Sequence, residues 1–362
     1  MLTQIFYYSY MIKTLVLTDF RNHKMSRINA GGARYIILCG PNGSGKTAVL
    51  ESISVMSPGA TLRGADASDI SRIGGGHASV FCELADGLEI SVTYTDGNSR
   101  RAKIGGDARP MSALPDAIKI IWLTPATDRL WTDAPAERRA FFDRLIGNFD
   151  AAHGGKVGRL QRLLSERSFA LKNGGTDAWI DPIDRNIAAL SVAIAAARIK
   201  YLERLTQFLP DIRITVNGIL EDQSGLGKTA GDVESDFYNY LADNRCLTGD
   251  KMSIDGAHKS DFSAYLTPIS MDAKMASTGQ QKSALVAIIS AHAKLLHAIG
   301  AKNLIVLLDE AASHLDKTAL QKTMHDLASA NAQIWMTSLH PAQYEHLPDS
   351  VFITCNDGKV VL

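Results

Sequence analysis

The stretch Gly40–Thr47, which reads GPNGSGKT, constrains the fold of this chain more than any other, because it matches the pattern G-x-x-x-x-G-K-[ST]. A short apolar run, Tyr35–Cys39, precedes it, and a plausible helix begins at Ala48. A strand, a glycine-rich loop and a helix in this order form the context in which the pattern binds phosphate. The sequence therefore predicts a phosphate-binding loop that follows a buried parallel strand.

The residue types of this loop have chemical reasons. Gly40, Gly43 and Gly45 allow the backbone to curl so that successive N–H groups point at one anion. Lys46 is expected to reach the β- and γ-phosphates, and Thr47 is expected to place its hydroxyl on Mg²⁺. The complete set of nucleotide-binding residues expected in the loop is Gly40, Pro41, Asn42, Gly43, Ser44, Gly45, Lys46 and Thr47.

The second half of the site is expected after another apolar strand, Leu304–Leu308, which is followed by Asp309 and Glu310. Ligands of open parallel sheets bind at the carboxyl ends of the strands, beside the phosphate loop. Asp309 is expected to hold Mg²⁺, and Glu310 to polarise the attacking water, so that with Lys46 they form the catalytic set. The alternative is a buried strand that simply ends in two solvated acids, and Lys46 upstream argues against it.

A third motif, Ser277–Lys282, precedes a predicted helix over 283–298. By itself it is an ordinary helix N-terminus. Its position before the Leu304–Leu308 strand resembles the signature motif of ATP-binding-cassette ATPases, which caps the γ-phosphate held by the opposite subunit. The nucleotide contacts that this resemblance implies are Ser277, Gly279 and Gln280, with Asp316 in a D-loop-like stretch. The switch position after the next strand is left open among Thr337, Ser338 and His340.

Charge and composition leave several function classes open. Lys and Arg together equal Asp and Glu together, 38 of each, so any nucleic-acid footprint must be local. The apolar runs are too short to span a bilayer, and the four scattered cysteines suit a reducing compartment. We therefore expect a cytoplasmic protein without a membrane partner. Residues 1–10 lack the features of a signal peptide, and Met11 is an alternative start, so 1–10 are a possible non-native extension.

The pattern along the chain predicts two lobes. An antiparallel meander is expected over 78–104, within an ATPase head formed by 11–125 and 265–362. A mainly helical second lobe is expected over 126–264, with a short helical-hairpin arm at about 156–208. The signature lies more than 200 residues after the phosphate loop.

With these pieces in place, the chain resembles the RecF family of bacterial recombination mediators. The resemblance rests on Leu17–Asn22, on Gly43–Thr47 followed by Leu50–Ile53 and Arg63, on Pro125–Asp143, and on Ser277–Lys282. It implies an α/β P-loop NTPase fold, the ATP-binding-cassette head of SMC and Rad50 proteins, with ATP and Mg²⁺ as cofactors. The chain departs from the family pattern at Ala48, at Gly256–Asp261, at Glu310 and over 121–132, where no glutamine occurs.

The resemblance also implies a function. ATP-dependent homodimers would clamp single-stranded, gapped or duplex DNA, with a weak, DNA-stimulated ATPase as the switch. With RecO and RecR the protein would help to load RecA in replication, gap repair and SOS induction. Arg63 could reach ATP, as arginines after this helix do in related heads. Candidate phosphate contacts, each by itself more typical of a solvated surface, are Arg100, Arg101, Lys103, Lys156, Arg159, Arg162, Arg167 and Lys172.

Two other functions compete with this interpretation. The chain could be the ATPase subunit of a membrane transporter, but such subunits keep a far shorter distance between phosphate loop and signature. It could also be a P-loop enzyme that transfers phosphate to a small molecule. That enzyme would turn over independently of DNA and of any change at Ser277.

Overall fold

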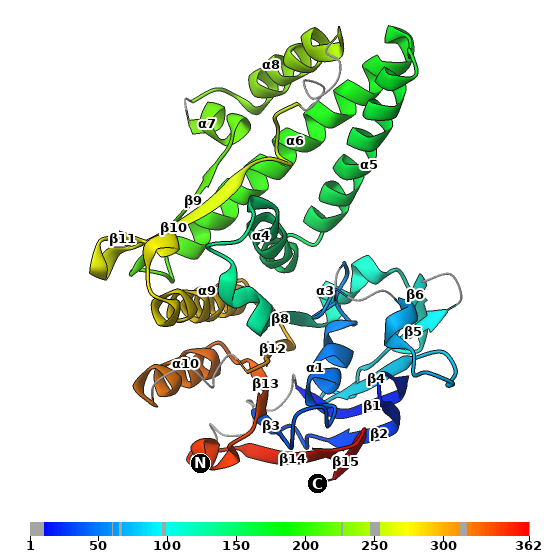
Figure 1. The fold of residues 1–362 in the computed structure, drawn as a ribbon, viewed down its shortest axis with the longest axis vertical. Coiled ribbons are helices and arrows are strands. Elements are labelled where there is room, and N and C mark those ends of the chain that lie inside the picture. Colours follow the sequence, from blue (N-terminus) through cyan, green and yellow to red (C-terminus); the bar gives the residue numbers. More distant parts are fainter. Residues whose placement is uncertain are drawn as a thin grey trace. The chain divides into compact units, whose positions relative to one another are not determined.

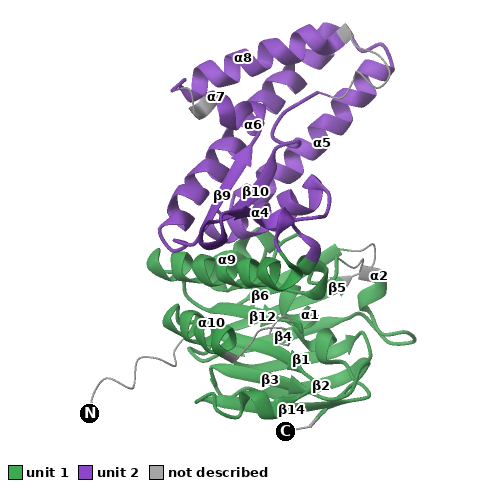
Figure 2. Cartoon of the chain, turned by 60° about the vertical axis from the view of Figure 1, so that its left-hand side comes forward, with its two compact units in different colours: residues 1–128, 277–362 green, residues 129–276 purple. Residues whose placement is uncertain are grey.

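The computed structural model describes residues 11–59, 61–64, 67–95, 99–225, 227–246, 254–310 and 317–361. The chain divides into two compact units (Figure 2), one from the described parts of 1–128 and 277–362 and the other from those of 129–276. The divisions fall after Asp128 and Ala276, whereas the sequence placed them after residues 125 and 264.

A mainly parallel sheet of the first unit carries the motifs. Its strands, in spatial order, are β15 (Lys359–Val361), β14 (Ser350–Asn356), β3 (Tyr35–Cys39), β13 (Gln333–Ser338), β12 (Leu304–Leu308) and β8 (Lys119–Leu123). Only the β14–β15 pair is antiparallel. Strands β3, β12 and β13 are buried throughout, and β3 and β12 accordingly read as continuous apolar runs. Because β13 lies between β3 and β12, its end stands between the phosphate loop and Asp309.

The second sheet is antiparallel. Its order is β2 (His23–Asn29), β1 (Ile12–Phe20), β4 (Ser79–Leu84), β5 (Glu89–Thr95), β6 (Ser99–Ile104) and β7 (Asp107–Arg109). Strand β2 was not expected, because its sequence HKMSRIN has few apolar residues. The fold compensates inside the sheet: His23 and Ser26 are buried, and the His23 Nδ1 lies 2.8 Å from the Ser26 Oγ.

Helix α1 (Lys46–Ser54) packs between these two sheets (Figure 1). Its Val49, Leu50 and Ile53 belong to one apolar core with residues of both sheets. A helix covered on all sides needs no polar face, so its sequence shows only weak amphipathic character. The remaining helices of this unit are α2 (Ala67–Ile70), α3 (Leu114–Ala117), α9 (Thr278–Ala298) and α10 (Lys317–Ser329), of which α9 and α10 pack together.

The second unit combines helices with a small antiparallel sheet. Helices α5 (His153–Lys172) and α6 (Asp177–Thr206) form a hairpin, and α6 also packs on α8 (Ala230–Asp243). The sheet order is β11 (Met271–Asp272), β10 (Asp261–Leu266) and β9 (Ile212–Asn217). Helices α4 (Pro135–Phe149) and α7 (Ile219–Gly225) complete the unit. The sequence left 221–256 undetermined, and its described part contains most of α7 and α8.

An ionic network lies inside the second unit. The Arg198 guanidinium donates to both carboxylate oxygens of Asp143, at 2.9 and 2.8 Å, and to the Ala257 carbonyl at 2.6 Å. His153 approaches the same carboxylate at 2.9 Å. Burial alone would raise the pKa of Asp143, but hydrogen bonds from His153 and Arg198 hold it below its usual value. This network joins α4, α5 and α6.

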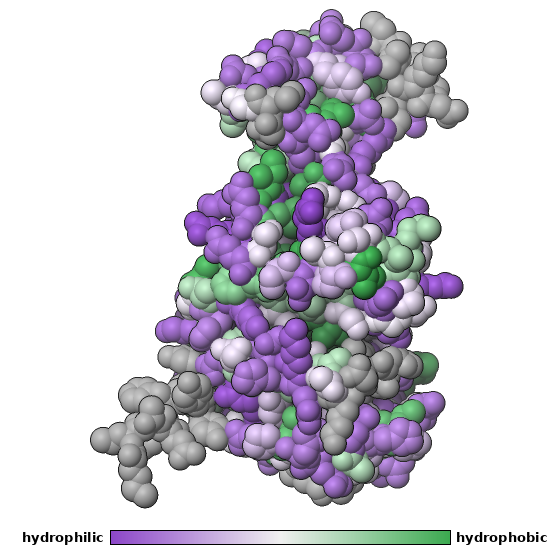
Figure 3. All heavy atoms as spheres, turned by 90° about the vertical axis from the view of Figure 1, so that its left-hand side faces the viewer, coloured by the Kyte–Doolittle hydropathy of each residue, from purple (hydrophilic) through white to green (hydrophobic). Residues whose placement is uncertain are grey.

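The surface seen in Figure 3 is mostly hydrophilic, with hydrophobic residues in smaller groups. Within the described ranges, the helices are too short or too polar for one of them to cross a membrane.

Candidate nucleotide-binding site

The phosphate loop has a conformation that requires glycine at two of its positions. Gly40 and Gly45 have φ values of 140° and 106°, in the region that side chains disfavour. A Cβ on Gly40 would lie 2.3 Å from the Cys355 carbonyl oxygen, and one on Gly45 would lie 2.6 Å from the His23 Nε2. Neighbouring segments therefore enclose the loop so closely that only glycine fits.

Lys46 is the first residue of α1 and lies against the loop that precedes it. Its Nζ donates to the carbonyl oxygens of Gly40 and Pro41 at 2.7 and 2.8 Å. The helix N-cap is Gly45, which has no side chain to cover the N–H groups of the first turn. These N–H groups and the ammonium form a positive end that suits an anion.

Thr47 and Asp309 meet although they are far apart in the sequence. The Thr47 Oγ1 donates to the Asp309 Oδ1 at 3.1 Å, and the Thr337 Oγ1 donates to the same oxygen at 3.0 Å. Burial raises the pKa of Asp309, and the two hydroxyl hydrogen bonds act in the opposite direction. One carboxylate and one hydroxyl are hard oxygen ligands of the kind Mg²⁺ uses beside phosphates, so these residues fit the expected metal.

Glu310 has an unusual backbone. Its φ is 53°, a left-handed conformation uncommon outside glycine, and its N–H donates to the Thr337 Oγ1 at 2.9 Å. Its side chain is exposed and lines the pocket described below. Strained residues concentrate at functional sites, and here the residue lines the same pocket as the phosphate loop.

Thr337 therefore contacts both acids at the switch position that the sequence left open. His340 is exposed, and its backbone N–H donates to Ser338 Oγ at 3.0 Å. None of the three residues lines the pocket, so the hydrogen bonds of Thr337 to Asp309 and Glu310 are what distinguish it. The geometry thus favours Thr337 over the histidine as the residue that senses Asp309 and Glu310.

We expect Thr337→Val to slow ATP hydrolysis about 5- to 160-fold, with ATP affinity little changed. Valine keeps the shape but removes a donor to Asp309 and an acceptor for the Glu310 N–H, a loss of about 1–3 kcal/mol. Thr337→Ser should restore the rate, and His340→Ala should leave it unchanged. Steady-state phosphate release measures all three. A valine variant as fast as the parent would rule out this role for Thr337.

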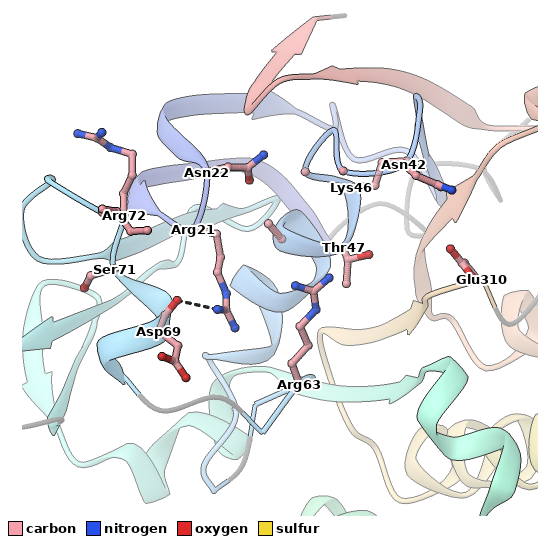
Figure 4. Close-up of a pocket in the computed structure, with 14 residues that line it drawn as sticks. Arg21, Asn22, Asn42, Lys46, Thr47, Arg63, Asp69, Ser71, Arg72 and Glu310 are labelled. Carbon is pink, nitrogen blue, oxygen red and sulfur yellow. Dashed lines mark hydrogen bonds between the residues drawn. The ribbon is translucent and has the colours of Figure 1, made fainter.

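The pocket at the loop has a volume of about 720 Å³, within the range of small-ligand sites. Figure 4 shows Lys46, Thr47, Asn42 and Glu310 toward one end, and Asp69, Ser71 and Arg72 toward the other. The full lining is Arg21, Asn22, Asn42, Gly43, Gly45, Lys46, Thr47, Ala48, Arg63, Asp69, Ser71, Arg72, Ile73 and Glu310. Arg63, which the sequence proposed as a nucleotide contact, is part of this lining.

The far end of this pocket was not predicted as a site. Arg21 has a φ of 53°, and its guanidinium binds both carboxylate oxygens of the buried Glu51, at 2.8 and 2.7 Å. It also donates to the Asp69 carbonyl at 2.6 Å (Figure 4). Arg72 is held by Asp19 at 2.7 Å. The signal in the sequence is the motif Leu17–Asn22, which indicated the family but not a place in the site.

The signature residues do not line this pocket. Ser277 caps α9, and its Oγ accepts a hydrogen bond from the Gln280 N–H while the Gln280 Oε1 accepts one from the Ser277 N–H, at 3.4 and 2.9 Å. Ser277, Gly279 and Gln280 are all exposed. These residues therefore offer a surface outside the pocket of their own chain. Asp316 lies outside the described residues.

The candidate DNA contacts fall into two groups. The first group has hydrogen-bond partners: Arg100 binds backbone carbonyls, Lys156 and Arg159 bind other side chains, and Arg167 is buried against Asp184 at 2.6 Å. Arg101 and Lys103 are exposed on β6, and Arg162 and Lys172 lie on α5 with their side chains not buried. This second group has no hydrogen bond or ion pair with another described residue, so it is more available to a partner than the first.

The C-terminal hairpin supports the phosphate loop. Its turn residues Asp357 and Gly358 both have positive φ, 46° and 69°. The Gly358 N–H donates to the Ser44 carbonyl at 3.2 Å, and a Cβ on Gly358 would lie 2.1 Å from the Asn22 carbonyl oxygen. The last strands thus fix the shape of a loop more than 300 residues earlier.

Gly358→Ala should therefore raise the dissociation constant for ATP by about tenfold, a cost of about 1.4 kcal/mol. The added methyl group would displace Asn22 and release Ser44, although Gly358 does not line the pocket. Gly87→Ala is the matched control: Gly87 also follows an aspartate and has a φ of 85°, but its Cβ would meet nothing within 4 Å. Nucleotide titrations measure the dissociation constant of each variant. If Gly87→Ala raised this constant as much as Gly358→Ala does, backbone strain alone, and not the contact with Asn22, would explain the weaker binding.

Comparisons with known proteins place this site in context. The DNA replication and repair protein RecF of Rhizobium johnstonii is 34% identical over 370 residues, covering 96% of this chain and 98% of the relative. RecF of Brucella suis is 33% identical over 368 residues, covering 96% of this chain and 95% of the relative. No protein-family model matches the chain.

Solved structures show the same fold. The recombination mediator protein RecF with ATP, of the RecFOR pathway, superposes with a TM-score of 0.82 at 20% identity, over 98% of this chain and 99% of that one. The SMC head bound to the C-terminal winged-helix domain of ScpA has a TM-score of 0.54 at 14% identity, over 97% of each chain. The predicted fold class, an ATP-binding-cassette ATPase head of the SMC type with an antiparallel insertion and a helical region, is confirmed.

Proposed function

The chain belongs to the RecF family of DNA replication and repair proteins, and from that membership we propose that it is an ATP-gated, DNA-binding recombination mediator. Two copies close on DNA when ATP is bound and separate after hydrolysis. ATP then acts as a switch that holds a dimer, and the weak ATPase resets it. Duplex, gapped and single-stranded DNA are the proposed ligands.

One observation supports this proposal best: the site is complete except for its signature. The pocket is lined by Lys46, Thr47 and Glu310, and Asp309 is hydrogen-bonded to Thr47. In contrast, Ser277 is exposed and does not line the pocket. A signature that acts on the γ-phosphate must then come from a second copy. Two identical chains related by a two-fold axis would complete two sites at once.

Each residue has a role in this scheme. Lys46 and the N–H groups at the start of α1 bind the β- and γ-phosphates, and Arg63 contacts the nucleotide. Thr47 and Asp309 would hold Mg²⁺, which when bound neutralises phosphate charge. The Glu310 carboxylate accepts a proton from the attacking water. The Thr337 hydroxyl oxygen orients Glu310 by accepting a hydrogen bond from the Glu310 backbone N–H. Gln280 and Gly279 complete the anion site of the partner copy together with Ser277.

Finer parts of the function rest on the family. One of the solved RecF structures is that of a recombination mediator in the RecFOR pathway. We extend this to RecO and RecR as partners of the present chain, and to RecA loading and SOS induction as the outcome. A cytoplasmic location follows from the same proposal.

The dimer test uses light scattering of the full chain with and without ATP. Glu310→Gln blocks hydrolysis, and in this background ATP should double the mass. Lys46→Ala, which should not bind ATP, and Ser277→Arg, which obstructs the signature, should both remain monomeric. Ser165→Arg is the matched control at an exposed serine of α5. A monomer in the Glu310→Gln background with ATP bound would contradict the gate.

A second measurement separates the competing functions. ATP hydrolysis and DNA binding are followed together on duplex, single-stranded and gapped DNA at several salt concentrations, because phosphate contacts make affinity salt-dependent. The proposal requires DNA binding that strengthens with ATP. Hydrolysis indifferent to DNA and to Ser277→Arg would favour a small-molecule phosphotransferase instead. Co-purification with a membrane protein would favour the transporter subunit.

A further inference from the structure

One face of the antiparallel sheet of the first unit carries half-buried and exposed side chains. Its other face packs on α1 and is buried, as the alternation of exposure along β4 shows: Val80, Cys82 and Leu84 are buried, while Ser79, Phe81 and Glu83 are half-buried. In Figure 1, α1 lies beside the inner side of this sheet. On the outer face, each strand therefore presents side chains that are not part of the buried core.

The strand register places these outer side chains in rows that cross five strands. One row, which runs from β2 to β6, consists of Arg27, Val16, Phe81, Ser91 and Lys103. The next row consists of Met25, Thr18, Ser79, Thr93 and Arg101. We call these two rows the outer-sheet surface. It has basic residues at both ends, with hydroxyl and apolar side chains between them.

The three cations of this surface have no carboxylate partner among the described residues. Arg27, Arg101 and Lys103 are exposed, and none of them forms an ion pair with a described residue. The two rows contain no carboxylate. Two other cations of the same sheet are paired: Lys13 with Glu83 at 2.9 Å and Arg109 with Asp107 at 3.7 Å. In a chain with zero formal charge, such a local excess of positive charge is a footprint for an anionic partner.

The spacing of the cations suits an extended polyanion. Neighbouring strands lie about 4.8 Å apart, so Arg27 and Lys103, separated by four strand intervals, stand about 19 Å apart. Arg101 and Lys103, two residues apart on β6, are separated by about 7 Å. A duplex carries about eleven phosphate charges over about 19 Å of its axis. A single phosphate or a nucleotide could not engage both ends.

We propose that the outer-sheet surface binds the sugar–phosphate backbone of duplex DNA. Arg27, Arg101 and Lys103 contact phosphates, and the hydroxyls of Thr18, Ser79, Ser91 and Thr93 are available as additional donors. These contacts read no base edge, so binding here is independent of sequence. The proposal rests on the DNA-binding function above and names the surface that performs it.

The surface favours a duplex over a single strand. Single-strand sites stack successive bases on several aromatic side chains. The outer-sheet surface has one aromatic residue, the half-buried Phe81, which cannot support a series of stacked bases. A protein partner is also less suited, because Met25 is the one large apolar side chain of these rows that is strongly exposed, at 72%.

Arg100, which precedes Arg101 in the same basic segment, does not belong to the outer-sheet surface. Arg100 points to the other side of β6 and donates to the carbonyls of Val55, Ser57 and Gly59, at 3.2, 3.2 and 2.5 Å. Its role is to fix the end of α1 and the loop after it. We therefore assign DNA contact to Arg101 and Lys103 but not to Arg100.

The test compares two triple variants of the full chain with ATP bound. Arg27→Ala/Arg101→Ala/Lys103→Ala removes the unpaired cations. Lys13→Ala/Arg109→Ala/Lys228→Ala removes the same charge from exposed lysines and an arginine that are ion-paired. Affinity for a duplex and for a single strand of equal length is measured by fluorescence anisotropy at salt concentrations from about 50 to about 300 mM, a range over which phosphate contacts weaken strongly. ATP titration shows that each variant is folded.

The first variant should lose duplex affinity by at least about tenfold at about 0.1 M salt, and its slope of log affinity against log salt should be shallower by about 2.7. The control should change either quantity little. Equal losses in both variants would mean that net charge alone matters, and an unchanged first variant would place the duplex elsewhere; both results overturn the surface. A larger loss on the single strand would also overturn it. If the parent chain binds no duplex, the DNA-binding function itself fails.

Discussion

Glu310→Gln is expected to slow ATP hydrolysis by about 10²- to 10⁴-fold, the usual contribution of a general base. Glutamine keeps the size of the side chain but cannot accept a proton from water. Glu310 lines the pocket, and its left-handed backbone is held by a 2.9 Å hydrogen bond to Thr337. Removing the carboxylate should therefore affect the chemical step and leave nucleotide binding intact.

The measurement is single-turnover hydrolysis with excess enzyme, together with the dissociation constant for ATP. The constant should stay within about threefold of the parent, because the phosphate contacts come from Lys46 and the N-terminus of α1. Glu166→Gln on α5 is the control for an acid-to-amide change. A Glu310→Gln variant that hydrolyses ATP within about threefold of the parent rate would assign the base to another residue.

The second large effect concerns stability. Arg198→Ala should destabilise the protein by about 3–5 kcal/mol, the cost of removing one partner from a buried ion pair, because Asp143 keeps His153 but loses both arginine hydrogen bonds. Arg198 is 2% exposed, and it holds Asp143 through two hydrogen bonds and the Ala257 carbonyl through a third. Urea unfolding followed by circular dichroism measures the loss. Arg185→Ala, on the same helix but exposed, is the control.

Two further results would identify the cause. In a double-mutant cycle with Asp143→Ala, the combined loss should be clearly smaller than the sum of the single losses. The pKa of Asp143 is held below its ordinary value of 3.8, so the stabilisation is complete above that pH and is lost as the pH falls through the lower, folded-state pKa. The difference between parent and Arg198→Ala should therefore shrink in acid. Additive losses would show that Arg198 acts through packing alone.

Much of the fold could be predicted because strong local signals agree with it. The buried strands β3 and β12 are continuous apolar runs, and each delivers its motif at the carboxyl end. The α5–α6 hairpin shows the helical period, and the turn after Lys172 contains two glycines. In contrast, β2 was missed, because His23 and Ser26 are polar residues whose burial depends on hydrogen bonds that no local pattern reveals.

The site divides in the same way. The sequence by itself predicted the phosphate loop Gly40–Thr47 and the two acids Asp309 and Glu310, because phosphate binding depends on local backbone shape and on residue type. Only the tertiary structure chose Thr337 over His340, because strand order places β13 between β3 and β12.

The register of the antiparallel sheet likewise decided which cations are available. Arg100 and Arg101 are adjacent in the sequence, yet they lie on opposite sides of β6, one bound to backbone carbonyls and the other exposed. A basic run in a strand always divides in this way, since successive side chains point to opposite faces. The sequence established that a positive segment exists. The tertiary structure determined which of its side chains are exposed, because side chains alternate between the two faces of a strand and only the packing of the sheet decides which face is buried.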